Sequence, residues 1–211
     1  MTRTASRFDW IAPVYDALGT IMFGSNLRDA QEACLESILP ESKILILGGG
    51  TGSFLPSLLA MNPRCQVWYI DLSAGMLRQA KQRVPAATGI QFLQGSENTL
   101  PADLKFDAVI TFFYLDLFPT STLHRVVERI NRSLRDDARW LVADFIDTGS
   151  PGRKILLRLM YLFFRWTCGI EALRLPDWPL ALAQSGWLRA EAKFLSSGFI
   201  VSSVYRRKAI G

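Results

Sequence analysis

The chain has 211 residues, of which 49% are hydrophobic and 20% are charged, and its formal net charge is +5. This length and composition fit one globular domain and exclude a disordered chain. Because Lys and Arg are spread along the sequence without a dense stripe, no nucleic-acid partner is expected. The three cysteines, Cys34, Cys65 and Cys168, lie too far apart for a metal-ligand spacing, so no metal site is expected. They indicate reduced thiols in a cytoplasmic protein, and the N-terminus lacks the apolar stretch of a signal peptide.

The first 40 residues predict a helical cap, and from residue 43 onward apolar runs typical of strands alternate with helical patterns. Near-continuous apolar strands separated by helices favour a parallel sheet covered on both faces, which is the doubly wound α/β fold. The predicted strands are 43–47, 66–71, 90–94, 106–113 and 138–145, and the predicted helices are 52–61, 73–84, 120–135 and 177–185.

The C-terminal part departs from this alternation. Residues 153–170 form an apolar run that Arg158 and Arg165 interrupt, and it is too short to cross a bilayer. By their spacing, Lys154, Arg158, Tyr161 and Arg165 share one helical face. Two interpretations stay open: a helix that packs on the core with solvated arginines, or a basic amphipathic element that covers an acceptor or lies on a membrane surface. Two further apolar runs on either side of Ser196–Gly198 predict an antiparallel hairpin over 188–207.

A glycine-rich turn follows the first predicted strand. In doubly wound sheets this turn is the usual ligand contact. The dinucleotide fingerprint is G-x-G-x-x-G, whereas this turn has the spacing G-x-G-x-G, and Ser53 stands where the third glycine is expected. Three interpretations therefore compete: the phosphates of a dinucleotide, a sulfonium cofactor, or a tight connection alone. The candidate binding residues of the turn are Gly48, Gly49, Gly50, Thr51 and Gly52.

An acidic residue, Asp71, ends the second predicted strand. A carboxylate in this place accepts charge-assisted hydrogen bonds from both ribose hydroxyls of an adenosine. The alternative is a helix N-cap, for which Asp is a preferred residue. Because Ser73 is available for the same cap, the pattern favours Asp71 as a ribose ligand.

Several segments in this order resemble the class I S-adenosylmethionine-dependent methyltransferases. The resemblance implies a Rossmann-like methyltransferase fold with a mostly parallel seven-stranded sheet that ends in an antiparallel hairpin, and S-adenosyl-L-methionine as the cofactor. The matching segments are "ILILGGGTG", "IDLSAGMLRQAKQR", "FLQGSENTLP", "KFDAVITFFYLDLFP" and "RSLRDDARWLVADF".

The resemblance also implies the residues of the site. Ile46 stands where the family has an acid, so the turn's backbone carbonyls are expected to hold the cofactor's amino group. Ser96 stands where the family has the Asp that contacts adenine, and either its hydroxyl or Glu97 is expected to make that contact. The implied cofactor-binding residues beyond the glycine turn are Asp71, Leu72, Met76, Ser96, Glu97 and Thr111, and the candidate catalytic residues are Asp116, Tyr15 and Tyr114.

Within the family, the opening segment "RFDWIAPVYDALGTIMFG" and the closing strands resemble the ubiquinone/menaquinone biosynthesis C-methyltransferases. Asp116 and Leu117 replace the Arg and Asn that quinone methyltransferases carry near the acceptor. The chain is expected to be a single methyltransferase domain, 1–211. Its expected parts are a cap over 1–40, a cofactor-binding core over 43–146, an acceptor-covering segment over 151–186 and the terminal hairpin.

The expected function is methyl transfer to a small hydrophobic or aromatic acceptor, quinone-like or lipid-like. Two alternatives remain: a catalytically silent member that binds a cofactor or partner, and a nicotinamide-dependent oxidoreductase. The expected location is the cytoplasm, with peripheral membrane contact through residues 153–170 as a further expectation.

Overall fold

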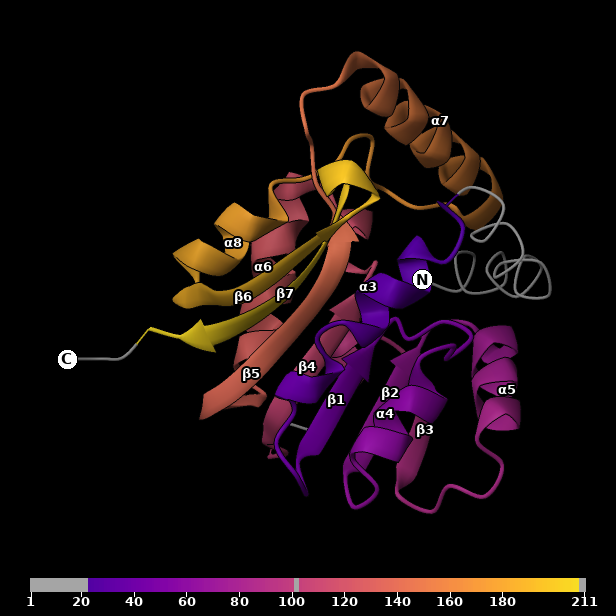
Figure 1. The fold of residues 1–211 in the computed structure, drawn as a ribbon, viewed down its shortest axis with the longest axis vertical. Coiled ribbons are helices and arrows are strands. Elements are labelled where there is room, and N and C mark those ends of the chain that lie inside the picture. The colour runs from indigo at the N-terminus through magenta and orange to yellow at the C-terminus, as the bar shows by residue number, and fades with distance from the viewer. Residues whose placement is uncertain (1–22, 101–102, 209–211) are drawn as a thin grey trace.

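The computed structural model describes residues 23–100 and 103–208, and within these ranges seven strands form one sheet (Figure 1). The strands are β1 (Lys43–Leu47), β2 (Gln66–Asp71), β3 (Ile90–Gln94), β4 (Phe106–Phe112), β5 (Leu134–Phe145), β6 (Trp187–Leu195) and β7 (Ile200–Arg207). Their order across the sheet is β3-β2-β1-β4-β5-β7-β6. The first five strands are parallel, and β7 pairs antiparallel with β5 and β6. The predicted mostly parallel sheet with a terminal hairpin is confirmed.

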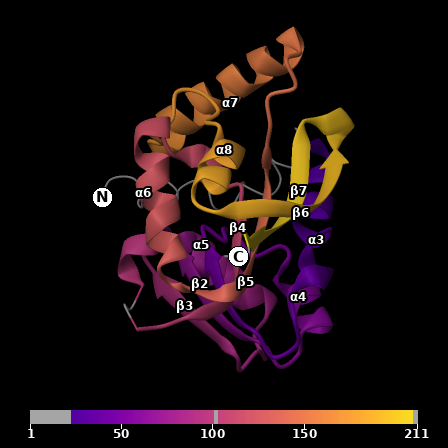
Figure 2. The ribbon, with the colours of Figure 1, turned by 90° about the vertical axis from the view of Figure 1, so that its left-hand side faces the viewer.

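Helices cover both faces of the sheet (Figure 2). The helices α3, α4 and α5 contribute to the hydrophobic cluster on one face, and α6 and α8 to the cluster on the other. The described helices are α3 (Asn26–Glu32), α4 (Leu55–Met61), α5 (Ala74–Arg83), α6 (Thr120–Asn131), α7 (Pro151–Cys168) and α8 (Trp178–Gln184). The short 3-10 turns are η1 (Leu35–Ser37), η2 (Glu97–Thr99), η3 (Leu115–Leu117) and η4 (Ser196–Gly198).

The first strand explains why these runs are apolar throughout. Residues 44–47 are all fully buried, with Ile44 and Ile46 in one cluster and Leu45 and Leu47 in the other. A strand buried on both faces needs apolar side chains at every position rather than at alternate positions. The core therefore lies on both sides of the central strands.

The predicted boundary between the third helix and the fifth strand was wrong. The helix predicted over 120–135 ends at Asn131, and the strand predicted from 138 begins at Leu134. Leu134 pairs with Phe106 of β4 and is buried, whereas the residues after it are polar and exposed. Pairing with a distant strand decides the structure here, and the local sequence carries no strand pattern.

The long helix α7 lies above the carboxyl ends of the central strands (Figure 1). Leu157, Met160 and Tyr161 bury one side of it against the core. Tyr161 does not share the exposure of the cations predicted to lie on its helical face, because Tyr161 is 4% exposed whereas Lys154 and Arg158 are exposed. In the described part of the chain, no helix has the length and apolar character needed to span a bilayer.

A buried hydrogen bond between two sheet strands gives a first test of the packing. Trp140 Nε1 of β5 donates to Thr111 Oγ1 of β4 at 2.8 Å, and both residues are fully buried. Thr111→Val keeps the shape but leaves the indole N–H without its acceptor. We expect the free energy of unfolding to fall by about 1–3 kcal/mol, measured by urea denaturation. The exposed Thr120→Val serves as the control, and a wild-type midpoint for Thr111→Val would show that this bond contributes nothing.

Candidate functional site

The turn after β1 depends on three glycines in the left-handed region. Gly48, Gly50 and Gly52 have φ angles of 62°, 63° and 71°. Glycine adopts this conformation without the steric cost that a Cβ atom imposes. The G-x-G-x-G spacing of the sequence therefore follows from the backbone of the turn.

Two aromatic rings lie directly against the turn. A Cβ atom on Gly48 would lie 2.3 Å from Tyr114 Cδ2, and one on Gly49 would lie 2.2 Å from Tyr69 Cζ. Tyr69 also donates its hydroxyl to the Gly50 carbonyl at 3.0 Å. The two rings pack against the turn and leave no space for a Cβ atom at position 49. This explains why residue 49 is glycine although its φ is not in the left-handed region.

The Asp71 carboxylate joins the turn to the start of α5. Asp71 Oδ2 accepts a hydrogen bond from Gly50 N, and Oδ1 accepts one from Ser73 N, both at 2.9 Å. Ser73 Oγ in turn accepts from Met76 N at 3.0 Å, so Ser73 is the N-cap of α5. The Asp71 carboxylate therefore fixes the glycine turn relative to the start of α5.

Glu97 and Tyr114 form a buried pair beside the turn. Tyr114 Oη donates to Glu97 Oε2 at 2.8 Å, while Glu97 Oε1 accepts from Asn98 Nδ2 at 2.8 Å. Burial, and then the negative charges of Glu97 and Asp71, raise the pKa of Tyr114 well above its usual range. Tyr114 is therefore a neutral donor that holds Glu97 in place. Ser96 caps η2 through a bond from Asn98 N at 3.3 Å.

The other expected site residues have varied surroundings. Leu72 is half-buried, and its carbonyl accepts a hydrogen bond from Gln94 Nε2 at 3.0 Å, whereas Met76 is 2% exposed. Thr111 is engaged by Trp140 within the sheet, and Ile46 is buried in the core. Cofactor contacts of Leu72, Met76 and Thr111 stay predictions. Tyr15 lies outside the described residues.

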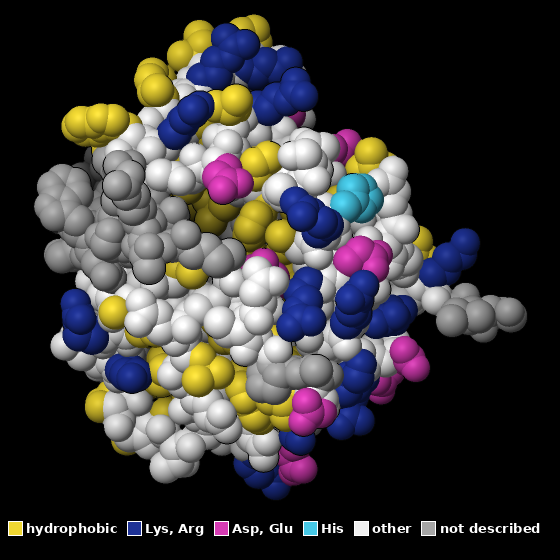
Figure 3. Space-filling view, turned by 180° about the vertical axis from the view of Figure 1, so that it is seen from behind, with side chains coloured by type: hydrophobic (Ala, Val, Ile, Leu, Met, Phe, Trp, Pro, Cys, Tyr) yellow, Lys and Arg dark blue, Asp and Glu magenta, His cyan; other side chains and the backbone are white. Residues whose placement is uncertain are grey.

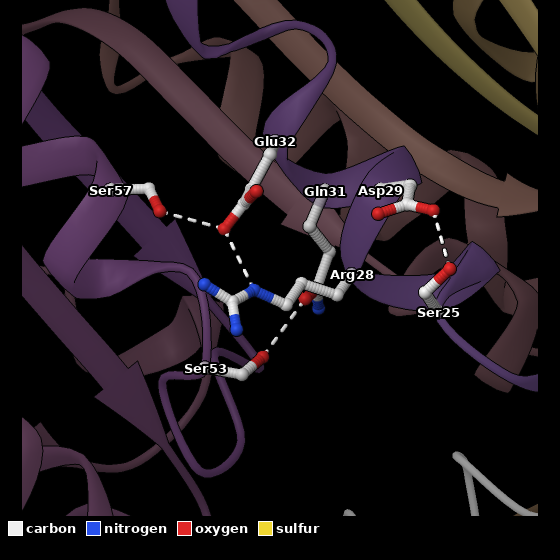
Figure 4. A network of polar contacts seen from close by, with 7 residues as sticks. All are labelled: Ser25, Arg28, Asp29, Gln31, Glu32, Ser53 and Ser57. Atoms are coloured by element: carbon white, nitrogen blue, oxygen red, sulfur yellow. Dashed lines mark hydrogen bonds and ion pairs between the residues drawn. The ribbon is translucent and has the colours of Figure 1, made fainter.

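Polar contacts with α3 hold the segment that follows the turn (Figure 4). Ser53 Oγ donates to Gln31 Oε1 at 3.0 Å, and Ser57 Oγ donates to Glu32 Oε1 at 2.7 Å. Arg28 Nε donates to the same Glu32 oxygen at 2.9 Å. Ser53, which departs from the dinucleotide fingerprint, thus attaches the turn to the N-terminal cap.

A second polar group lies at the carboxyl ends of β4 and β5. Asp116 of η3 and Asp144 of β5 are 3% and 0% exposed, and Asp116 N donates to Asp144 Oδ2 at 3.3 Å. Tyr161 of α7 donates its hydroxyl to the Asp116 carbonyl at 3.2 Å. The sequence interpretation included Asp116 but missed Asp144. An acid inside the apolar run "WLVADF" was the available signal, because buried polar residues are rare and informative.

Comparisons with known proteins agree with this geometry. Residues 44–137 match the sequence profile described as "Methyltransferase domain". Over 154 residues, the chain is 36% identical to the ubiquinone/menaquinone biosynthesis C-methyltransferase UbiE of Syntrophotalea carbinolica, covering 70% of this chain and 63% of that protein. It is 31% identical over 123 residues to the malonyl-[acyl-carrier protein] O-methyltransferase of Methylococcus capsulatus, covering 56% of this chain and 44% of that protein. The chain thus spans less than two thirds of the length of either relative.

The fold is that of solved methyltransferases. The Burkholderia thailandensis 1,6-didemethyltoxoflavin-N1-methyltransferase, crystallised with 1,6-didemethyltoxoflavin and S-adenosylhomocysteine, superposes with a TM-score of 0.70 at 16% identity. The alignment covers 97% of this chain and 88% of that one. The strand order and the superposition define a Rossmann-like methyltransferase fold. Residues 44–137 thus form a methyltransferase domain, and the chain is similar in sequence to the UbiE-named relatives.

The contacts of Asp71 lead to a test of its role. Asp71→Ala removes the carboxylate that faces Gly50 and Ser73, so we expect the affinity for S-adenosylmethionine to fall by about 1.5–3 kcal/mol, measured by calorimetry. Ser73→Ala is the control, since it removes the cap of α5 and keeps the carboxylate. An equal loss of affinity in both variants would place the effect in the fold of α5 rather than in a contact with ribose.

Proposed function

We propose that the protein is an S-adenosylmethionine-dependent methyltransferase that acts on a small hydrophobic or aromatic acceptor, quinone-like or lipid-like. The observation that carries this proposal is the Asp71 carboxylate beside a left-handed glycine turn at the carboxyl edge of the sheet. In doubly wound sheets, ligands bind at this edge. The names of the relatives support the same chemistry.

The residues present fit the cofactor. Gly48 and Gly49 pack so closely on the rings of Tyr114 and Tyr69 that a Cβ atom would clash there, and the Asp71 carboxylate lies beside the same turn. Glu97 and Ser96 lie at the end of β3, where the adenine contact is expected. When bound, S-adenosylmethionine supplies a methyl group on an activated sulfonium. The chain's own part is to hold the two reactants in line and to exclude water.

Asp116 is the candidate base for the acceptor. Asp116 follows β4 at the carboxyl edge of the sheet. Its backbone carbonyl accepts a hydrogen bond from the hydroxyl of Tyr161 on α7. Burial raises the pKa of Asp116 from its usual range to about 7. A base with a pKa near the working pH is efficient in taking a proton from a phenol, an enol or an acidic carbon.

The outer side of α7 supports a lipophilic acceptor met at a membrane surface. The helix carries four cations and no Asp or Glu. Its exposed side places apolar residues beside those cations, as Figure 3 shows at the top of the molecule. Such an arrangement is typical of helices that lie in an anionic bilayer surface. The exposed apolar residues are Ile155, Leu159, Leu162, Phe163 and Trp166, with exposed fractions of 58%, 59%, 65%, 38% and 80%.

Calorimetry with three ligands tests the proposed cofactor. We expect S-adenosylmethionine and S-adenosylhomocysteine to bind, because both carry the ribose that Asp71 is proposed to accept. We expect NAD not to bind, because the turn lacks the third spaced glycine. Tight binding of NAD without a response to the sulfonium would favour an oxidoreductase. Binding of S-adenosylmethionine with no methyl transfer to any acceptor would favour a silent member of the family.

Vesicle sedimentation tests the membrane contact of α7. We expect the protein to bind vesicles of phosphatidylcholine and phosphatidylglycerol more tightly than vesicles of phosphatidylcholine alone. Arg158→Gln combined with Arg165→Gln should weaken that binding by about 1 kcal/mol for each charge.

Trp166→Ala should weaken binding to both kinds of vesicle, because it removes the most exposed apolar side chain of α7. The matched control is Leu188→Ala on β6, where a leucine is 54% exposed. If Leu188→Ala has the same effect as Trp166→Ala, the contact is not specific to α7. If the α7 variants change only self-association, the occupant of this face is a second copy of the chain.

A further inference from the structure

The residue that follows β4 has an unusual backbone conformation. Phe113 has a φ of 52°, in the left-handed region. This region is uncommon for a residue with a Cβ atom, and a bulky side chain is strained there. Strained residues gather at active sites and ligand-binding positions, where the surrounding structure holds them in place. Phe113 is thus a candidate for a role at the carboxyl edge of the sheet.

The left-handed conformation changes which face of the sheet the next side chains reach. Along a strand, successive side chains point to opposite faces. Ile110 and Phe112 belong to the hydrophobic cluster that includes the buried side of α7, so alternation would place Phe113 on the other face. Phe113 instead packs against the same cluster as Phe112, and Tyr114 belongs to the opposite one. The turn at Phe113 therefore directs Tyr114 toward Gly48 and keeps its own ring on the face of α7.

Phe113 joins a group of aromatic rings on that face. Its ring centroid lies 5.2 Å from that of Phe145, and the two planes are tilted by 49°. Phe145 lies in turn 5.3 Å from Phe199 and 5.4 Å from Phe23. These three rings are 5%, 2% and 8% exposed, whereas Phe113 is half-buried. The aromatic group therefore reaches the surface at Phe113.

The end of β5 holds Phe113 close to the candidate base. Phe113 N donates to the Ala143 carbonyl at 2.7 Å, and Asp116 N donates to Asp144 Oδ2 at 3.3 Å. Two successive residues of β5 thus fix both ends of a short segment that begins with an aromatic ring and ends with a carboxylate. The ring and the acid lie at the same edge of the sheet.

We propose that Phe113 is a specificity-determining residue for the methyl acceptor: its half-buried ring packs against an aromatic ring of the acceptor beside Asp116, and its left-handed backbone holds it there. This inference rests on the proposed methyl transfer, and it selects an aromatic acceptor over a saturated one. Two aromatic rings in offset or edge-to-face contact gain more than their buried area alone provides, which corresponds to about a two- to tenfold difference in affinity.

Calorimetry with two matched ligands tests this role without turnover. The protein, saturated with S-adenosylhomocysteine, is titrated with 2-naphthol and with its saturated analogue decahydro-2-naphthol. Phe113→Leu keeps an apolar side chain but removes the ring, so we expect the ratio of the two affinities to fall by about two- to tenfold in favour of the saturated ligand. Phe113→Tyr should restore the wild-type ratio. An unchanged ratio in Phe113→Leu would overturn the proposal.

A second variant separates the ring from the backbone. Phe113→Gly adopts the left-handed region without strain, so it keeps the turn and removes the ring. The ratio should fall in Phe113→Gly as it does in Phe113→Leu. A fall in Phe113→Leu alone would assign the effect to a changed turn and contradict the proposed contact.

The matched control is Phe194→Leu on the edge strand β6, where the phenylalanine is 56% exposed. This variant should keep the wild-type ratio, and an equal fall in Phe194→Leu would overturn the proposal. The affinity for S-adenosylhomocysteine distinguishes the two levels of inference. If wild type binds it but binds neither naphthol ligand, the role of Phe113 is overturned and the proposed cofactor stands. If wild type does not bind it, the proposed function fails and this inference fails with it.

Discussion

The hydrogen bonds of the Asp71 carboxylate are the contacts on which the rest of the candidate site depends. The turn contains three glycines in the left-handed region, and such a segment loses much conformational entropy on folding. Asp71 fixes it by binding Gly50 N, and it fixes the entry to α5 by binding Ser73 N. Strands β1 and β2 are parallel neighbours, so their carboxyl ends meet at one edge. One side chain thus orients two loops that come from different parts of the chain.

The aromatic rings beneath the turn and the buried acids beside it follow from a second constraint. A sheet covered on both faces leaves little polar space, so each polar group at its carboxyl edge must find a partner nearby. Tyr69 and Tyr114 satisfy that need with the Gly50 carbonyl and with Glu97. Among the described residues, Asp116 is a buried acid whose Oδ1 has no partner. An unsatisfied buried oxygen lowers stability, and a ligand that donates to it recovers that loss.

Local patterns were sufficient for the central strands and for the glycine turn. The bounds of β1, β2 and β3 agree with the sequence prediction, since each is a short apolar or β-favouring run beside polar residues. The start of β5 was missed because Leu134 joins the sheet only through its pairing with Phe106. Asp144 and Tyr161 were missed as site residues for the same reason. They contact Asp116 from two other elements, β5 and α7, and no sequence period encodes such contacts.

Helix α7 connects two parts of the proposed function physically. Its buried side presents Tyr161 to the Asp116 carbonyl, and its outer side exposes Trp166 beside cations. In the proposed function, the acceptor binds at Asp116 next to this helix, and a lipophilic acceptor comes from the membrane surface that the same helix contacts. Binding to a membrane that favours a displaced α7 would therefore also favour access to the acid, because a ligand shifts an equilibrium toward the state it binds better. A single amphipathic element is thus sufficient to couple the arrival of the acceptor to the opening of its site.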